Sequence, residues 1–468
     1  MDDFLREIQT SVFREWINNQ KRDYYHLHQS ETDPDAIIIE NEYCYSYVTF
    51  NPQCIIELCV MNKRTDEMAF YLHFQFKTLK HAISLFEEMD QCIKKMVDQP
   101  MCRLLLCCSG GMTTAFFADK IKNGIKVLNL NMEVAATSYQ KIYHVAQNYD
   151  VILLAPQVSY VKLQVEKVFK NKLVLKIPTQ IFASYNVGAL ITFVEESLKH
   201  KENKYNGYVE PLASMMEIKT NKHVLAVSIN ANGENSHISY RLYNSHQDIV
   251  LDSNIIKSNI KVQDVLDALD TVVLQNEMID VISIALPGVM VEGNVYSGII
   301  EGGNHQLKER LEKRYEKEIY LINDVNAAVV GYYASQNEYK SLAFLFQPIG
   351  RMAGSGIIVS GQLVRGMDHL AGEVALLPLN LSDAYLTLAN TPEGTLELVT
   401  KNIMSIIAIV APEAIVVYSD LILDSQDVSD EIKKSLSQYS LKVYPKIIKV
   451  ENILEYILLG AMILSAKE

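Results

Sequence analysis

Residues 104–108 of this 468-residue chain form an apolar run that ends in a cysteine, a residue type that can act as a nucleophile. A Ser-Gly-Gly turn follows Cys108, and a helix is expected over residues 113–122. Backbone N–H groups at a helix N-terminus bind anions and lower the pKa of a nearby thiol. The sequence therefore predicts an ionised Cys108 beside a phosphate-sized hole, where the sulfur can accept a phosphoryl group.

Other interpretations of this loop remain open. Two cysteines at a strand end are also explained by burial, because cysteine packs like a small hydrophobe, and strand alternation points Cys107 into the core. A phosphatase-type loop needs an arginine where Thr113 and Thr114 stand. A thioredoxin-like motif needs a second cysteine where this chain has glycine. A phosphocysteine carrier needs only a low-pKa thiol and amide donors, so we favour that interpretation.

The stretch from Cys108 to Thr114 resembles the active loop of enzyme IIB of the lactose/cellobiose class of the phosphoenolpyruvate:sugar phosphotransferase system. Residues 150–160 are similar to a second signature of that family, and together the two signatures span residues 101–198. The resemblance implies that Cys108 takes a phosphoryl group from a phosphohistidine of a IIA-type protein and passes it to a sugar held by a membrane IIC protein. The implied loop and rim residues are Ser109, Gly110, Gly111, Met112, Thr113, Thr114, Pro156, Gln157 and Tyr160. An ordinary turn at a strand end explains the last three nearly as well.

A second set of residues suited to chemistry lies in residues 223–468. The stretch Asn323-Asp324-Val-Asn-Ala-Ala resembles a block of the ROK family (repressors, open reading frames and sugar kinases), and Ala-Gly-Glu373 resembles another. The resemblance implies that Asp324 is the general base of a sugar kinase, although helix capping explains a carboxylate there equally well. The implied sugar-binding residues are Gly303, Asn304, Asn323, Asp324 and Glu373.

The chain departs from that family where a nucleotide binds. The first phosphate loop should read D-x-G-G-T, but residues 230–234 read Asn-Ala-Asn-Gly-Glu, and Glu234 repels a triphosphate. The second should begin Gly-Thr-Gly, but Gly350-Arg351 stands there, and the cysteines of the family's zinc cluster are absent after Cys108. Phosphoryl transfer from ATP depends on phosphate positioning and metal, so we predict little or no transfer. Mg-ATP is a cofactor only if the region is an active kinase, and no zinc is expected.

Charge, cysteine content and hydropathy limit the partners and the cellular location that the chain can have. The formal net charge of −13 argues against nucleic-acid binding, which needs a basic face. The seven cysteines show no Cys-x-x-Cys spacing, which indicates reduced thiols. No leader is recognised at the start, and the most apolar segment, residues 456–466, is too short to span a bilayer. We predict a cytoplasmic protein.

The pattern of elements predicts an α/β protein of several domains. Residues 1–100 are expected to form a small α+β unit, with helices at 4–19 and 78–97 and strands at 43–50, 54–61 and 68–76. Residues 101–200 alternate strand and helix, with a strand expected at 126–132, and predict a flavodoxin-like or P-loop-type parallel sheet. Residues 201–222 are a polar linker. Residues 223–468 are expected to form an actin/hexokinase-like (ribonuclease H-like) domain of two lobes.

These observations lead to one hypothesis and two alternatives. The hypothesis is a cytoplasmic phosphotransferase that carries phosphate on Cys108, coupled to a ROK-like domain that binds or senses a sugar or sugar phosphate and has a regulatory role. The first alternative is an active ATP-dependent sugar kinase with Asp324 as general base. The second is a non-enzymatic scaffold or transcription regulator. A homodimer is implied only by the ROK resemblance, and the role of residues 1–100 is not predicted.

Overall fold

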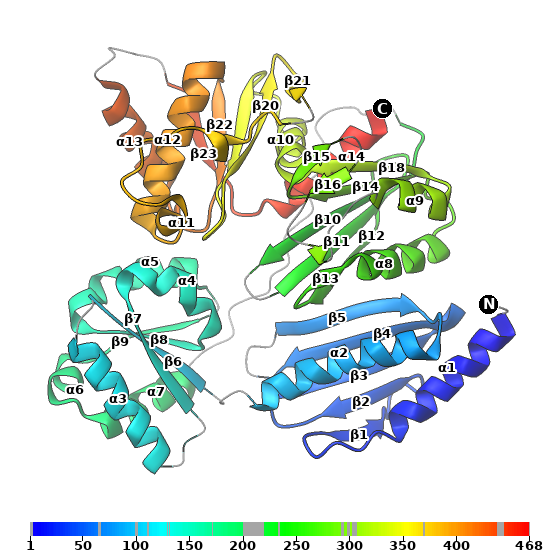
Figure 1. Ribbon diagram of the computed structural model, residues 1–468, viewed down its shortest axis with the longest axis horizontal. Helices are drawn as coiled ribbons and strands as arrows, with labels where there is room; N and C mark the ends of the chain where they lie inside the picture. The colour runs from blue at the N-terminus through cyan, green and yellow to red at the C-terminus, as the bar shows by residue number, and fades with distance from the viewer. Residues whose placement is uncertain are drawn as a thin grey trace.

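The strands of the protein form three main sheets, of ten, five and four strands, within the described part of the chain. The computed structural model describes residues 3–63, 67–98, 102–109, 112–128, 130, 132–170, 172–199, 220–232, 235–291, 294–296, 300–301, 307–367, 370–437 and 444–467. In Figure 1 the ten-stranded sheet runs from blue into green, the four-stranded sheet is cyan, and the five-stranded sheet is yellow to orange.

The N-terminal unit, residues 3–98, is an antiparallel meander with two helices, and the helices and strands expected there are confirmed. Its elements are α1 (Asp3–Asn18), β1 (His26–Gln29), β2 (Ala36–Glu40), β3 (Cys44–Asn51), η1 (Pro52–Cys54), β4 (Ile55–Asn62), β5 (Glu67–Gln75) and α2 (Leu79–Asp98). Strands β1 and β2 were not expected. Burial alternates over the first residues of β3, as the period of a strand requires, whereas β4 is buried along most of its length.

The two lobes of residues 220–467 repeat one topology. Their strands are β10 (Val224–Asn232), β11 (Asn235–Tyr243), β12 (Ile249–Lys257), β13 (Ile260–Lys261), β14 (Val281–Leu286), β15 (Val289–Val291), β16 (Asn294–Tyr296), β17 (Ile300–Glu301), β18 (Glu318–Asn323), β19 (Leu342–Phe346), β20 (Gly354–Val359), β21 (Gln362–Leu363), β22 (Ala414–Tyr418) and β23 (Lys446–Lys449). Their helices are α8 (Val262–Gln275), α9 (Leu307–Tyr315), α10 (Asp324–Ala334), η6 (Val374–Leu376), α11 (Tyr385–Leu388), α12 (Pro392–Val410), α13 (Ser425–Leu436) and α14 (Leu454–Lys467). The first lobe has the strand order β12-β11-β10-β14-β18 and the second lobe β21-β20-β19-β22-β23. In both lobes the first three strands are antiparallel and the last two are parallel to the central one.

Helices α10 and α14 pack closely between the two lobes, and their residues share one hydrophobic cluster with strands of both sheets. Glycine permits this approach. A Cβ atom at Gly460 would lie 1.8 Å from the carbonyl oxygen of Ala327, and one at Gly331 would lie 2.0 Å from that of Tyr456. The helices can therefore touch only because each presents hydrogen where other residues carry a side chain.

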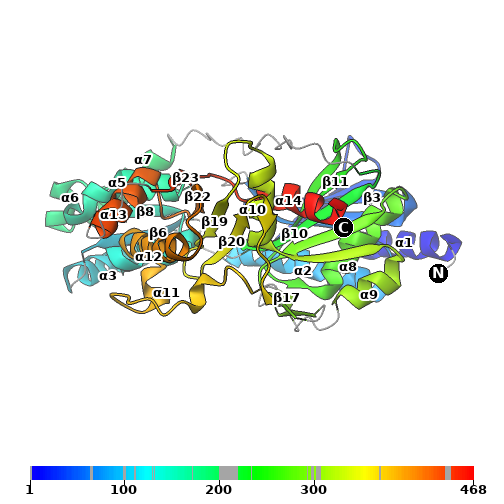
Figure 2. The same cartoon turned by 90° about the horizontal axis from the view of Figure 1, so that it is seen from above.

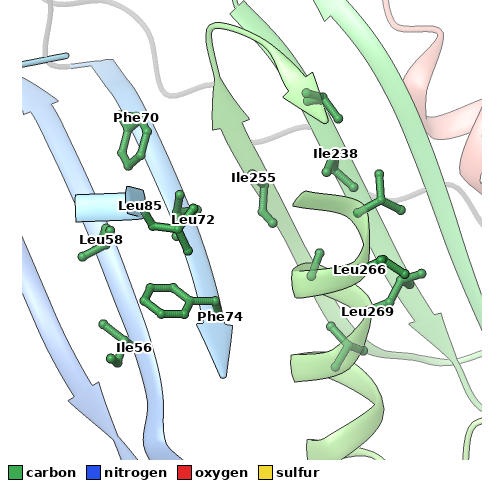
Figure 3. Close-up of a cluster of buried hydrophobic side chains, with 14 of the residues drawn as sticks. Ile56, Leu58, Phe70, Leu72, Phe74, Leu85, Ile238, Ile255, Leu266 and Leu269 are labelled. Carbon is green, nitrogen blue, oxygen red and sulfur yellow. The ribbon is translucent and has the colours of Figure 1, made fainter. Parts of the chain in front are cut away.

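The sheet of the N-terminal unit continues into that of the first lobe. Strand β5 pairs with β12 through Tyr71 and Ile256, which gives the order β1-β2-β3-β4-β5-β12-β11-β10-β14-β18. One hydrophobic cluster spans the junction. Figure 3 shows side chains of this cluster on both sides of the junction, among them Phe74 and Leu85 of the N-terminal unit and Leu266 of α8. Buried apolar area of this kind is the main stabilising contribution to folding, so the two units form one packed body.

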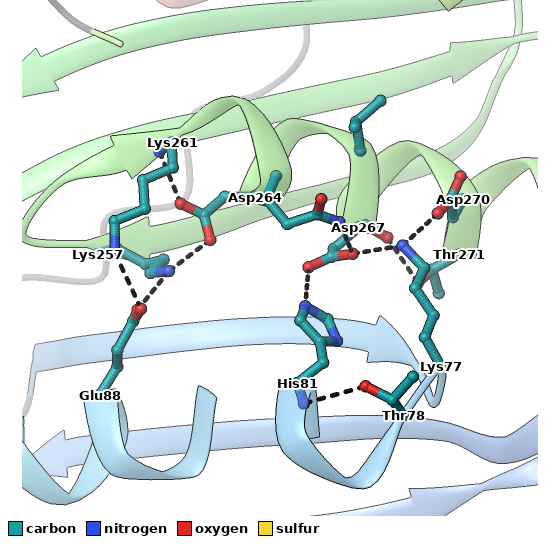
Figure 4. Close-up of polar contacts among 12 residues, drawn as sticks. Lys77, Thr78, His81, Glu88, Lys257, Lys261, Asp264, Asp267, Asp270 and Thr271 are labelled. Carbon is teal, nitrogen blue, oxygen red and sulfur yellow. Dashed lines mark hydrogen bonds and ion pairs between the residues drawn. The ribbon is translucent and has the colours of Figure 1, made fainter. Parts of the chain in front are cut away.

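Charged side chains reinforce the same junction (Figure 4). The ion pairs across it include Lys77–Asp267, Lys77–Asp270, His81–Asp267, Lys257–Glu88 and Lys261–Glu88. Lys257 is the most deeply placed, with 3% of its side chain exposed, and it also binds Asp264. Burial acts to lower the pKa of Lys257, but Asp264 and Glu88 raise it above its usual value overall. The ammonium group is therefore charged and compensated on both sides.

The parallel-sheet unit, residues 102–199, has four parallel strands in the order β7-β6-β8-β9. Its elements are β6 (Cys102–Cys108), α3 (Met112–Val127), β7 (Met132–Ser138), η2 (Tyr139–Lys141), α4 (Ile142–Val145), η3 (Ala146–Asn148), β8 (Val151–Leu154), η4 (Pro156–Val161), α5 (Lys162–Val168), β9 (Leu173–Lys176), α6 (Thr179–Ser184) and α7 (Val187–Lys199). The prediction of a strand at residues 126–132 is wrong, since the strand β7 begins only at Met132. Helix α3 runs on to Val127, because the apolar residues around Ile125 belong to its buried face. Figures 1 and 2 both place this unit against the second lobe.

Candidate functional site

Cys108 is the last residue of β6, at the point where the strand order reverses. Strand β6 lies between β7 and β8, and Cys108 is level with Ser138. Parallel α/β sheets bind ligands at such switch points, beyond the carboxyl ends of the strands. Helix α3 begins shortly after Cys108, as the sequence predicts. The backbone thus places the sulfur-bearing residue where the fold offers a binding edge.

The neighbouring cysteine has a different environment. Cys107 is fully buried in the core of the sheet, and burial raises its pKa to about 12. Cys107 therefore remains a thiol at neutral pH and is a poor nucleophile. Cys108 has 4% of its surface exposed. All seven cysteines are described, and none of them forms a disulfide.

The loop and rim residues predicted around Cys108 are only partly described. Ser109 is exposed, and Met112, Thr113 and Thr114 form the first turn of α3. Gly110 and Gly111 lie outside the described residues. After the neighbouring strand β8, Ala155 is followed by Pro156, which begins η4.

That rim lies at the same sheet edge as Cys108, because β6 and β8 are adjacent and parallel. Gln157 is exposed, and Tyr160 has 75% of its surface exposed. The Ser159 hydroxyl donates to the Pro156 carbonyl at 2.9 Å, which fixes the turn between them. An exposed aromatic side chain at this end of the sheet offers a protein partner an apolar contact.

Asp324 is a second candidate, buried at the start of α10. Only 6% of its surface is exposed, and its carboxylate accepts a hydrogen bond from the backbone N–H of Val325 at 2.9 Å. Burial raises the pKa of Asp324 to about 6, and the charge of Glu373 adds to that rise. Burial also raises the pKa of Glu373. The two predicted residues are therefore electrostatic neighbours, although one follows β18 and the other precedes η6.

The side chain of Asn323, a predicted sugar-binding residue, already forms hydrogen bonds within the protein. Its side-chain oxygen accepts hydrogen bonds from the N–H groups of Val325 and Asn326, both at 3.0 Å, and its NH₂ group donates to the Gly288 carbonyl. Asn323 rather than Asp324 is thus the N-cap of α10. Gly303 and Asn304 lie outside the described residues.

Two polar side chains near Asp324 were missed by sequence reasoning. The Asn326 side-chain oxygen and the Ser355 hydroxyl are buried and, within the described part of the chain, have no hydrogen-bond partner. Gly372 lies against Ser355 with φ +95°, and a Cβ there would lie 1.7 Å from the Ser355 carbonyl oxygen. Glycine at 372 therefore sets the position of Glu373. Ser355 could be recognised as a candidate site residue only from the fold, which brings Gly372 and Glu373 to it.

The loop that replaces the second phosphate loop is bound within the protein. The N–H of Gly350 donates to the Ala389 carbonyl at 2.9 Å, and that of Ala353 donates to the Tyr385 hydroxyl at 3.2 Å. A phosphate would need such amides as donors. These residues do not fit the phosphates of Mg-ATP, and the described residues include no cluster of three His, Cys, Asp or Glu side chains able to hold a metal.

The pH dependence of stability should report the state of Asp324. An aspartate whose pKa rises from 3.8 to about 6 on folding must lose its proton at a cost to the native state. The wild type is therefore expected to lose up to about 3 kcal/mol relative to Asp324→Asn as the pH rises from about 4 to about 6, and no more above that. Urea unfolding of both proteins across this range measures the difference. A difference that does not change with pH would contradict the assignment.

Comparison with known proteins identifies two regions in the chain. Residues 103–191 match the family model "PTS system, Lactose/Cellobiose specific IIB subunit", and residues 232–395 match that of the "ROK family". These matches confirm both resemblances predicted from the sequence, and the matched parts are called the IIB region and the ROK region below. The PTS system oligo-beta-mannoside-specific EIIB component of Bacillus subtilis (strain 168) is 30% identical over 67 residues. That segment is 14% of this chain and 65% of the relative, so less than two thirds of the relative is spanned.

Solved structures similar to this chain include ROK proteins of several kinds. A ROK family protein from Streptococcus pneumoniae TIGR4 in complex with sucrose is 17% identical, with a TM-score of 0.42 over 52% of this chain and 97% of that one. A ROK family glucokinase from Streptomyces griseus in complex with glucose and AMPPNP is 15% identical, with a TM-score of 0.42 over 53% and 100%. A ROK family transcriptional regulator, a homologue of the E. coli MLC protein, is 15% identical, with a TM-score of 0.39 over 53% and 81%. In the described part of this chain, every helix is too short or too polar to cross a membrane.

Proposed function

We propose that this protein accepts a phosphoryl group on Cys108 from a phosphohistidine protein of the IIA type, and that its ROK region binds a sugar or sugar phosphate to give a regulatory output. The observation that carries this proposal is the position of Cys108, at the end of β6, at the switch point of a parallel sheet and just before a helix. The match of residues 103–191 to the IIB model supports it. A flavodoxin-like fold for this region, a cytoplasmic location, a membrane IIC partner and a homodimer belong to the same proposal, as do domain boundaries at residues 100, 200 and 222.

The transfer is a direct displacement at phosphorus. The Cys108 thiol loses its proton, its sulfur attacks the phosphorus of the donor, an S–P bond forms and the P–N bond to imidazole breaks. The departing imidazole nitrogen takes up a proton, so that charge and atoms balance. Because only 4% of Cys108 is exposed, residues around the sulfur must move apart when the donor docks. Cys107 takes no part, since its raised pKa keeps it protonated.

The ROK region is proposed to bind rather than phosphorylate. Asp324 and Glu373 supply hydrogen-bond acceptors for sugar hydroxyls, and the two unpartnered polar groups at Asn326 and Ser355 lie on adjoining elements. The amides of the loop at residues 350–353 are already engaged with protein acceptors. Sugar binding without phosphoryl transfer from ATP follows from this combination.

A labelling experiment tests the proposal. The full chain is incubated with phosphoenolpyruvate, the general phosphotransferase proteins and a IIA protein, and phosphorylated peptides are located by mass spectrometry. The expected result is one phosphoryl group on the peptide that contains Cys108. Absence of label, in a mixture that labels a known IIB protein, would overturn the proposal.

An active sugar kinase is a second candidate, favoured by one observation. A carboxylate with a pKa of about 6 lies close to the operating pH, which suits a general base. ATP turnover with a panel of sugars tests this candidate, with Asp324→Asn as the control. Turnover no greater than that of Asp324→Asn would exclude it.

A further inference from the structure

The edge of the IIB region that carries Cys108 lies against the second lobe. Tyr139 follows Ser138, the residue level with Cys108 on β7. Its hydroxyl donates to the Glu393 carboxylate, in the first turn of α12, at 2.9 Å. His144 Nδ1 and the side-chain oxygen of Asn390, also near the start of α12, lie 3.0 Å apart. Figures 1 and 2 both show the cyan IIB region against the orange helices of the second lobe.

Apolar side chains complete this contact. Leu421, which follows β22 of the second lobe, is buried within the hydrophobic cluster of the IIB region. Ile349 packs against the same cluster. Ile349 precedes Gly350, whose N–H bonds to Ala389 beside Asn390. The contact therefore reaches the loop that stands in place of the second phosphate loop.

The contact is small and partly polar. Besides these side chains, the exposed pair Lys170–Glu451 joins the two parts at 3.8 Å. Small polar interfaces between domains open and close readily. A phosphohistidine donor must reach the edge that contains Cys108, and Tyr139 already holds part of this edge against the second lobe. Docking of the second lobe and docking of the donor are thus expected to compete.

A change of charge at Cys108 is expected to favour release of the second lobe. A phosphoryl group brings a charge of about −1.5 to −2 at neutral pH. On Cys108 it would lie one strand from Tyr139, whose hydroxyl binds the carboxylate of Glu393. The phosphoryl group and the Glu393 carboxylate would carry charges of the same sign, and like charges repel more strongly where burial reduces screening by solvent.

We infer that the second lobe is an intramolecular partner of the Cys108 edge, docked through Tyr139 and Glu393 while Cys108 is a thiol and released when Cys108 carries a phosphoryl group. This inference rests on the proposed function. It gives the phosphorylation state a physical route to the ROK region, through the loop at Ile349 and the start of α12.

Hydrogen–deuterium exchange of the full chain tests the inference, read at residues 139–145 and 389–395. Phosphorylation is expected to increase exchange at both segments by about tenfold, as for release of a docked interface. Tyr139→Phe removes the hydroxyl and keeps the ring, so it should increase exchange about fivefold without phosphorylation, the effect of losing one hydrogen bond. Tyr185→Phe, a matched change on the IIB region near α6, should leave both segments unchanged.

Glu393→Gln separates docking from release. Glutamine keeps an oxygen that accepts from the Tyr139 hydroxyl but removes the charge, so docking should persist and phosphorylation should increase exchange much less than in the wild type. Phosphorylation of Cys108 with unchanged exchange at both segments would overturn the inference and leave the proposed function standing. Unchanged exchange in Tyr139→Phe would also overturn it. Failure to phosphorylate Cys108 would overturn both.

Discussion

Cys108→Ser is expected to reduce phosphoryl labelling from a IIA-type donor to background. A serine hydroxyl fits the space of a thiol but ionises far less readily at neutral pH, and the ionised sulfur is the nucleophile. The change leaves β6 and its pairing with β7 and β8 in place, so folding should be retained. Quantitative mass spectrometry of the labelled peptide measures the effect, and far-ultraviolet circular dichroism checks the fold.

Cys107→Ala is the matched control. Cys107 is one residue earlier on the same strand, is buried and has a pKa of about 12, so its removal should leave labelling within about twofold of the wild type. The change also deletes a core atom and should cost roughly 1 kcal/mol of stability. Label that persists in Cys108→Ser, or that disappears in a folded Cys107→Ala, would contradict the assignment of the acceptor.

Lys257→Met is expected to destabilise the protein by about 3–5 kcal/mol, because it leaves the buried carboxylate of Asp264 without its counter-charge. Lys257 has 3% of its side chain exposed and lies between Asp264 of the first lobe and Glu88 of the N-terminal unit. Methionine fills a volume similar to that of lysine, so the lost stability comes from removal of the charge rather than from poorer packing. Urea unfolding followed by tryptophan fluorescence measures the loss, since Trp16 packs against the shared core.

Two comparisons sharpen this prediction. Lys261→Met removes a lysine that also pairs with Glu88 but is 52% exposed, and it should cost at most about 1 kcal/mol. Lys257→Met combined with Asp264→Asn should recover part of the loss, because asparagine is neutral and still accepts from the N–H of Lys261. Equal losses for the two lysine variants would show that Lys257 does not hold the junction together.

The candidate site residues were predicted from local sequence patterns. The Cys108 turn and the block around Asp324 are contiguous, so their residue types and spacing are visible without a fold. The strands β3 to β5 were predicted because turn residues at Asn51-Pro52 and Asn62-Lys63 separate three long, mostly apolar runs. Strand β1 was missed because it is a short, exposed edge of sequence His-Leu-His-Gln. Strand β7 was misplaced because its small residues give little contrast with the end of α3.

Long-range contacts carried no signal in the sequence. Tyr71 and Ile256 pair across the junction, and the sequence around either residue does not predict this pairing. The hydrogen bond from Tyr139 to Glu393 likewise joins parts of the chain that each look like ordinary surface. Asparagine and aspartate are both favourable N-cap residues, so the sequence does not decide between Asn323 and Asp324. The structure shows Asn323 as the N-cap, because it shows at which residue α10 begins.

The continuous ten-stranded sheet has a consequence for synthesis of the chain. Strand β5 emerges from the ribosome well before β12, the strand that covers its outer edge, and the whole IIB region is made in between. During that interval β5 presents open backbone groups and an uncovered apolar face, features that favour association with other chains. We therefore expect nascent chains that end between β5 and β12 to depend on chaperones far more than the completed protein does.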